Sequence, residues 1–276
     1  MKQINAFKNM LWALAIVLCL AGLLIALLFA AFTHYDGPKE RGGVQLGMER
    51  STEQKNPDGL DAGVSPAAQP GRLAETDDGG QGYIDGLTFL VDSTLIGLRD
   101  YGILSGGTET TQVWGSPTGS IPADSLGSFT IRYPNDGSYI SPADAAMIAK
   151  PARLILCLGA DGLSQTSEQQ FKDGYLSLIN GIRQVSPDTT LVLCTLPSVS
   201  EEYGGDDGLT PELLEQVNTW IRSICAETGI PCAEIGGALN NSGDGRLMST
   251  YAAANGKSLN SAGLNVVLHY LRTHTV

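Results

Sequence analysis

The chain has 276 residues, five cysteines and a formal net charge of -12, a length that suits one or two domains. Nucleic acid is not an expected partner, because phosphate contacts need clustered Lys and Arg and here 29 Asp and Glu outnumber 17 Lys and Arg. Five cysteines are also too few for a scaffold held together by disulfides.

An unbroken apolar run at 10–32, MLWALAIVLCLAGLLIALLFAAF, follows the first nine residues. About 20 such residues cross a hydrocarbon core as a helix. A cleaved signal peptide has a shorter apolar region of roughly 7–15 residues and a small-residue cleavage site, so we expect an uncleaved membrane anchor. Because Lys2 and Lys8 precede the run and no acidic residue does, the positive-inside rule places residues 1–9 in the cytoplasm and the rest of the chain outside the membrane.

The next segment, 33–82, is rich in Gly, Pro, Asp, Glu, Ser and Gln and has no helical or strand period. Such a segment buries too little apolar surface to offset the entropy lost on ordering it. We therefore predict a flexible extracytoplasmic linker at 33–82, followed by one domain of ordinary size at 83–276.

Within 83–276, short apolar runs alternate with amphipathic stretches. The runs predict strands at 87–91, 152–159, 189–197 and 230–236, and the amphipathic stretches predict helices at 167–185, 210–229 and 261–272. The helix at 210–229 has Thr210 as its N-cap, Pro211 at its first position and Gly229 at its end, which are strong boundary signals. Buried strands alternating with helices predict an α/β fold, with a parallel sheet covered on both faces.

Four of the cysteines lie in the predicted domain. Cys157 and Cys194 fall in predicted buried strands, where cysteine behaves as a small apolar side chain. Cys225 and Cys232 flank the turn AETGIP. Outside the cytoplasm this pair either forms a disulfide or stays reduced, and the sequence does not fix the Cα separation that decides between the two.

Ligands of such sheets bind beyond the carboxyl ends of the strands, so the residues there indicate the chemistry. Asp92 and Ser93 follow the first strand in FLVDSTLIGL, and Asp161 follows the second in LCLGADGLS. Taken alone, Ser93 suits a helix cap. Together with VWGSP at 113–117 and NGKSLNSAGLNVVLHYLRTH before the C-terminus, these segments resemble the SGNH or GDSL-type hydrolase family, especially its membrane-tethered bacterial members.

The resemblance covers about residues 83–276. It implies a three-layer α/β/α sandwich and, for active members, hydrolysis of esters, often acetyl or acyl groups on carbohydrates. In that family a serine attacks the ester, a histidine takes its proton, and an aspartate orients the histidine. The backbone N–H groups of the serine and of a glycine, together with an asparagine side chain, stabilise the oxyanion.

The nucleophile block is largely retained. By position Ser93 matches the nucleophile and Asp92 matches the aspartate before it, while Val91 replaces a glycine of the block. Gly115 in VWGSP is our candidate for the oxyanion glycine, with Gly119 as the alternative.

Three other matched positions hold residues that do not supply the family's chemistry. Asp161 stands at the asparagine position, Asn255 at the aspartate position and Ser258 at the histidine position. An ionised carboxylate donates no hydrogen bond, and loss of one oxyanion donor costs about 10²–10³ in rate. Loss of the base costs up to about 10⁶. Lys257 is an alternative base for a Ser-Lys pair, but we expect its side chain to point into water.

Two functions follow. The first is a domain that has lost catalysis and binds a glycan, an acylated cell-wall fragment or a protein through the old cleft. The second is a working esterase or carbohydrate deacetylase that uses Ser93 with an unforeseen base. The joint change at the three positions favours the first. No cofactor is expected, because the carboxylates Asp92, Asp161 and Glu234 are scattered and no His or Cys cluster has metal-ligand spacing.

Overall fold

The structure is a computed structural model that describes residues 71–205 and 207–276. In that part of the chain, no helix combines the length and the hydropathy needed to span a bilayer. The transmembrane helix predicted at 10–32 lies outside the described residues, as do positions 33–70 of the predicted linker.

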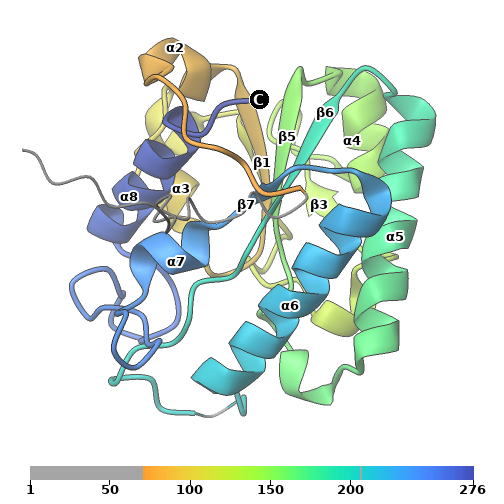
Figure 1. Ribbon diagram of the computed structural model, residues 1–276. Coiled ribbons are helices and arrows are strands. Elements are labelled where there is room, and N and C mark those ends of the chain that lie inside the picture. The colour runs from red at the N-terminus through yellow and green to blue at the C-terminus, as the bar shows by residue number, and fades with distance from the viewer. Residues whose placement is uncertain (1–70, 206) are drawn as a thin grey trace, which may run out of the picture. The chain divides into compact units, whose positions relative to one another are not determined.

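A parallel sheet forms the centre of the domain (Figure 1). In spatial order its five strands are β2 (Val113–Trp114), β1 (Leu87–Val91), β5 (Arg153–Cys157), β6 (Thr190–Cys194) and β7 (Cys232–Ala233). All but one residue of each inner strand, β1, β5 and β6, is buried. Such uninterrupted apolar strands need cover on both faces of the sheet.

Helices supply that cover on both sides. One group contains α4 (Pro142–Ala149), α5 (Glu168–Val185) and α6 (Pro211–Thr228), and Figure 1 shows it on one face of the sheet. The other face is covered by α2 (Gly80–Asp85), α3 (Gly97–Asp100), α7 (Ile235–Leu239) and α8 (Ser261–Arg272). The predicted α/β fold with a parallel sheet between helices is thus confirmed.

Several short elements were not predicted. They are the strand β2, the helices α2, α3, α4 and α7, the antiparallel pair β3 (Ile131–Arg132) and β4 (Tyr139–Ile140), and the 3-10 turns η1 (Gly107–Glu109), η2 (Ala123–Ser125) and η3 (Leu163–Gln165). The strand predicted at 230–236 is mostly wrong, since only the two residues of β7 pair with β6 and α7 begins at Ile235. Glu234 instead ends the strand and binds Arg222 of α6, with Oε1 2.9 Å from Nε.

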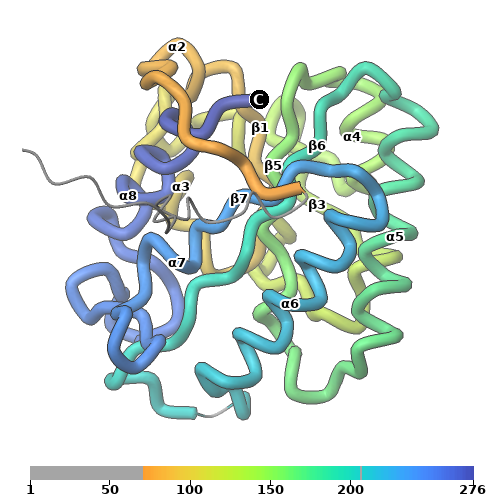
Figure 2. The backbone as a smooth tube through the Cα atoms, in the orientation of Figure 1, coloured from red at the N-terminus to blue at the C-terminus, as the bar shows by residue number. Residues whose placement is uncertain are grey.

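The described domain begins earlier than the predicted boundary at 83. Gly71 and Leu73 pair with Cys232, since the Cys232 N–H donates to the Gly71 carbonyl and the Leu73 N–H donates to the Cys232 carbonyl. Further on, the Thr76 N–H donates to the Thr273 carbonyl at 2.7 Å. Figure 2 shows this orange segment beside the blue C-terminal end of the chain. Because these contacts satisfy backbone polar groups, residues 71–82 belong with the domain.

Caps mark the ends of the long helices. Thr210 accepts a hydrogen bond from the Leu213 N–H, as predicted for an N-cap, and Gly229 has the left-handed φ of +68° expected after a helix. Asn260 caps α8 in the same way, accepting from the Gly263 N–H. The residue before it, Leu259, donates its N–H to the Thr94 carbonyl at 3.0 Å. The loop before α8 is therefore held against the end of β1.

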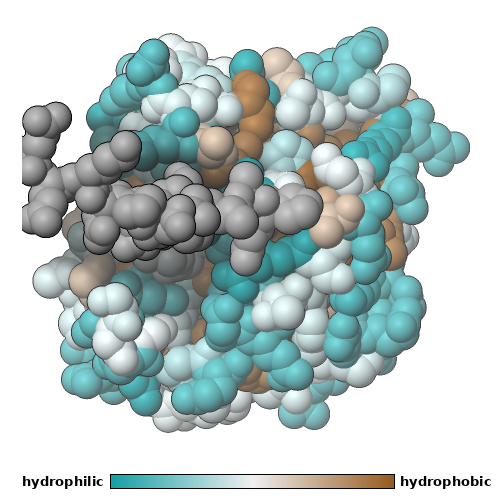
Figure 3. All heavy atoms as spheres, viewed as in Figure 1, coloured by the Kyte–Doolittle hydropathy of each residue, from teal (hydrophilic) through white to brown (hydrophobic). Residues whose placement is uncertain are grey.

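The surface and the interior of the domain hold different kinds of side chain. The face seen in Figure 3 is mostly hydrophilic, with hydrophobic residues in narrow strips. In the described part of the chain the cysteines Cys157, Cys194, Cys225 and Cys232 are all buried free thiols. The strand cysteines are thus core side chains, as predicted.

Candidate functional site

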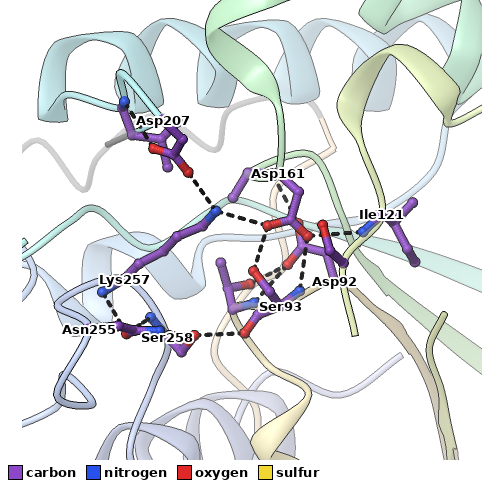
Figure 4. A network of polar contacts seen from close by, with 12 residues as sticks. Asp92, Ser93, Ile121, Asp161, Asp207, Asn255, Lys257 and Ser258 are labelled. Carbon is purple, nitrogen blue, oxygen red and sulfur yellow. Dashed lines mark hydrogen bonds and ion pairs between the residues drawn. The ribbon is translucent and has the colours of Figure 1, made fainter. Parts of the chain in front are cut away.

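Three of the sequence-predicted site residues meet at the carboxyl edge of the sheet (Figure 4). Ser93, which follows β1, donates its hydroxyl hydrogen to Asp161 Oδ1 at 2.5 Å. Ser258, in the loop before α8, donates its hydroxyl hydrogen to the Ser93 carbonyl at 2.9 Å. The topology therefore brings together positions that are far apart in the sequence, as expected for residues that follow parallel strands.

The Asp161 carboxylate is the centre of this network and is only 4% exposed. Its Oδ2 accepts hydrogen bonds from two backbone N–H groups, those of Ser93 at 3.2 Å and Ile121 at 3.0 Å. Two converging backbone donors are the usual parts of an oxyanion hole. In this chain both donors are bound to one oxygen of the Asp161 carboxylate.

Lys257 provides the counter-charge. Its Nζ lies 2.8 Å from Asp161 Oδ1 and 3.0 Å from Asp207 Oδ2, and its side chain is only 13% exposed. The expectation that Lys257 points into water is therefore wrong. The physical reason is that a buried carboxylate is costly unless a cation and hydrogen bonds compensate it.

Both charged groups are held in their ionised forms. Burial acts to raise the pKa of Asp161, but contacts with Lys257 and Ser93 outweigh it, and the pKa lies below the ordinary carboxyl value. Burial likewise acts to lower the pKa of Lys257, but Asp161 and Asp207 raise it above the ordinary lysine value. At neutral pH the pair is a carboxylate and an ammonium. Neither has a pKa near 7, the value that suits a general base.

Asn255 and Ser258 form a local hydrogen-bonded pair. Asn255 Nδ2 donates to Ser258 Oγ at 3.0 Å, and Asn255 Oδ1 accepts from the backbone N–H groups of Lys257 and Ser258. Asn255 thus contacts position 258 directly, but neither side chain is basic. Of the described histidines, His269 is exposed on α8 and His274 stacks on Tyr270 with ring centroids 3.9 Å apart. Neither has a hydrogen bond to Ser93 in the described structure.

Asp92 is fully buried and joins two strand ends. One carboxylate oxygen accepts from the backbone N–H and the hydroxyl of Thr94, and the other accepts from the N–H groups of Gly159 and Ala160. Burial, followed by the nearby charge of Asp161, raises the pKa of Asp92 to about 6. Through these contacts Asp92 links the loop that carries Ser93 to the loop that follows β5, which is a structural role.

Neither predicted oxyanion glycine has a hydrogen bond to Asp161 in the described structure. Gly115 lies against Ile96, where an added Cβ would come within 2.6 Å of a side-chain carbon. The Gly119 N–H is already bound to the Ser116 carbonyl at 3.0 Å. The second N–H that points at Asp161, beside that of Ser93, belongs to Ile121 instead. The sequence carried no signal for it, because almost every residue has a backbone N–H.

Sequence reasoning also missed Asp207, which is one of several acidic residues in the stretch EEYGGDDG. Lys257 had a usable signal, since a carboxylate at a buried strand end requires a nearby cation. Among the described residues, no group of three or more His, Cys, Asp or Glu side chains is placed to hold a metal ion.

No protein-family model matches the chain, and no curated protein matches its sequence. Among solved structures, a protein from Streptococcus pneumonia that is provisionally assigned as a platelet activating factor aligns at 14% identity over 68% of this chain and 82% of its own, with a TM-score of 0.50. A provisionally assigned acylhydrolase from Bacteroides fragilis aligns at 12% identity over 76% and 94%, with a TM-score of 0.47. A GDSL-like lipase from Bacteroides thetaiotaomicron aligns at 10% identity over 66% and 82%, with a TM-score of 0.43. Identities this low bear on the fold alone.

Proposed function

We propose that this chain, which has the SGNH or GDSL-type hydrolase fold, is a membrane-tethered binding domain that does not hydrolyse esters. One observation carries the proposal. The Asp161 carboxylate accepts the two backbone N–H groups, of Ser93 and Ile121, that would stabilise an oxyanion. An ester carbonyl would have to displace a buried, ion-paired carboxylate to reach them. Displacing such a group costs several kcal/mol.

Charge opposes the reaction further. Attack by Ser93 would place a developing negative oxygen beside the Asp161 carboxylate, which is ionised at neutral pH. Oxyanion holes work through donors and positive charge at this point, and loss of one donor alone costs about 10²–10³ in rate. Lys257 offsets part of the repulsion, but its ammonium already binds Asp161 and Asp207.

The alternative of a working esterase is favoured by one contact, the 2.5 Å hydrogen bond from the Ser93 hydroxyl to Asp161. In that reading Asp161 would take the serine proton. The direction of its pKa argues against it, because a carboxylate whose pKa lies below the ordinary value is a weak base toward a hydroxyl. Lys257 is equally unsuited, since its raised pKa keeps it protonated.

The cellular setting of the proposal comes from the sequence. The apolar run at 10–32 and the lysines before it support an anchor that leaves the domain outside the membrane. The sequence resemblance of 83–276 to the SGNH or GDSL-type family implies, for active members, hydrolysis of acetyl or acyl esters on carbohydrates. A glycan or an acylated cell-wall fragment is therefore the ligand class we favour, with a surface protein as the alternative, bound at the carboxyl edge of the sheet.

Hydrolysis of p-nitrophenyl acetate by the purified full-length chain tests the proposal. We expect wild type, Ser93→Ala and the control variant Ser177→Ala, which changes an exposed serine on α5, to give the same rate per mole of folded protein. Circular dichroism checks that all three are folded. A wild-type rate that clearly exceeds that of Ser93→Ala, with Ser177→Ala unchanged, would establish the esterase alternative instead.

A further inference from the structure

Two cysteines meet where helix α6 ends and strand β7 begins. Cys225 lies in the last turn of α6, which ends at Thr228, and Cys232 is the first residue of β7. The two residues are only 1% and 2% exposed, and both are thiols in the described structure. The sequence left open whether they form a disulfide, because it does not fix how close the two side chains come.

The structure brings this pair together. The Cys232 N–H donates to the Gly71 carbonyl at 2.6 Å, and a Cβ added to Gly71 would lie 3.7 Å from the Cys225 Cβ. Gly71 thus contacts both cysteines. The Cys232 side chain also contacts the Cys225 thiol, and this contact, followed by burial, raises the pKa of Cys225. Two thiols in contact inside the domain are placed to form one S–S bond.

The polar neighbour of Cys232 does not depend on the thiol hydrogen. Cys232 Sγ lies 3.9 Å from Glu234 Oε1, which is a long contact. The Glu234 carboxylate already accepts two hydrogen bonds from Arg222, each 2.9 Å long. A disulfide at Cys232 would therefore leave no buried acceptor without a partner.

A second pair of buried cysteines shows that contact alone is not enough. Cys157 and Cys194 are the last residues of β5 and β6, which pair in parallel. Neighbouring strands lie about 4.7–4.9 Å apart, whereas the Cβ atoms of a disulfide lie about 3.5–4.5 Å apart. The sheet therefore holds Cys157 and Cys194 too far apart. Cys225 lies on a helix instead, so the spacing of the sheet does not fix its distance from Cys232.

We propose that Cys225 and Cys232 form an intramolecular disulfide when the domain folds outside the cytoplasm. One cysteine thiolate attacks a sulfur of a small-molecule disulfide such as oxidised glutathione, which forms a mixed disulfide and releases one thiolate. The second cysteine thiolate attacks the mixed disulfide, which forms the Cys225–Cys232 bond and releases the other thiolate. The cysteines are oxidised, and the oxidant is reduced to two thiols that take up the two cysteine protons. The exchange occurs during folding, because both cysteines are buried afterwards.

The bond would strengthen the edge of the sheet at which the described domain begins. Residues 71–73 pair with β7 through Cys232, which donates to the Gly71 carbonyl and accepts from the Leu73 N–H. A disulfide from Cys232 to Cys225 ties this edge to the helix layer. The inference stands whether or not Ser93 is catalytic, but formation of the bond in cells rests on the proposed location outside the membrane.

Refolding of the full-length wild-type chain in detergent tests the pairing. The reduced chain is unfolded in urea, refolded with reduced and oxidised glutathione, treated with N-ethylmaleimide in denaturant and digested with trypsin. The tryptic peptide 223–246 holds Cys225 and Cys232 and no other cysteine. We expect it to take up maleimide only after reduction, while Cys157 and Cys194 are labelled before reduction. Maleimide or glutathione on Cys225 and Cys232 before reduction, or a bond from either to another cysteine, would overturn the inference.

Thermal unfolding of matched variants gives a second readout. The oxidised wild type should melt about 5–10 °C above the same protein kept reduced, because the closed loop constrains the unfolded chain. The double variant Cys225→Ala, Cys232→Ala should lose this difference, and the control Cys157→Ala, Cys194→Ala should keep it. The reverse result in the two double variants would overturn the inference.

The same peptide, taken from cell membranes after blocking with maleimide, tests the location separately. We expect the disulfide to be present there as well. A bond that forms on refolding but is absent from the cellular protein would confirm the pairing and contradict the location outside the cytoplasm.

Discussion

The triple variant Asp161→Asn, Asn255→Asp, Ser258→His is expected to hydrolyse p-nitrophenyl acetate at least about 10³-fold faster than wild type. Position 258 already contacts the backbone of residue 93, since Ser258 Oγ lies 2.9 Å from the Ser93 carbonyl oxygen. Position 255 already contacts position 258 through a 3.0 Å hydrogen bond. The three changes thus supply a base, a carboxylate to orient it, and a neutral donor in place of the negative charge at 161.

The three single variants are the controls for this gain. Because triad members act as a unit, each single change should stay near the wild-type rate, including Asp161→Asn, which frees the donors but adds no base. Adding Ser93→Ala to the triple variant should remove the gained activity. A folded triple variant that remains at the wild-type rate would contradict the match between these three positions and those of the family.

Replacing Lys257 with methionine is expected to lower the free energy of unfolding by about 3–5 kcal/mol, the usual cost of leaving one member of a buried ion pair without its partner. Methionine keeps most of the apolar stem, so the loss reports the charge. The Asp161 carboxylate would remain buried with only neutral donors, from Ser93 and Ile121. Urea denaturation followed by circular dichroism measures the change.

Asp207 offers a matched control, because it binds the same ammonium from a side chain that is 37% exposed. Asp207→Asn should cost less than about 1 kcal/mol, as exposed pairs do. The double variant Asp161→Asn, Lys257→Met should recover most of the stability lost in Lys257→Met, since no buried charge is left unpaired. If Lys257→Met costs no more than Asp207→Asn, the Asp161–Lys257 pair is not a buried, mutually dependent pair.

The main elements of the fold were predictable because their patterns are long or strongly apolar. The five-residue strand β1 and the helices α5 and α6 carry clear periods and caps, and their predicted positions agree with the structure to within a few residues. The strand β2 has only two residues, which is too few for any period to appear. At β7 the apolar composition predicted a strand of seven residues, but only two residues pair with β6. The strand ends there because Glu234 leaves the sheet to bind Arg222.

Some residues of the candidate site were predictable from the sequence and others were not. Ser93 and Asp161 were found because parallel strands end at a common edge, so residues after different strands become neighbours. The contribution of Ile121 is a backbone N–H, which residue identity does not encode. The position of Lys257 depends on how the loop before α8 is packed, and the charge of Asp161 was the one clue to it.

Labelling of the full-length chain with a fluorophosphonate tests most directly whether Ser93 is an activated nucleophile, because it needs no knowledge of the natural ligand. With its donors bound to the Asp161 carboxylate and no base beside it, Ser93 should remain unmodified in wild type. Labelling should equal that of Ser93→Ala, while the triple variant should become modified at Ser93. Stoichiometric modification of Ser93 in the wild-type protein, located by peptide mass spectrometry, would contradict the proposal that this domain binds without hydrolysing.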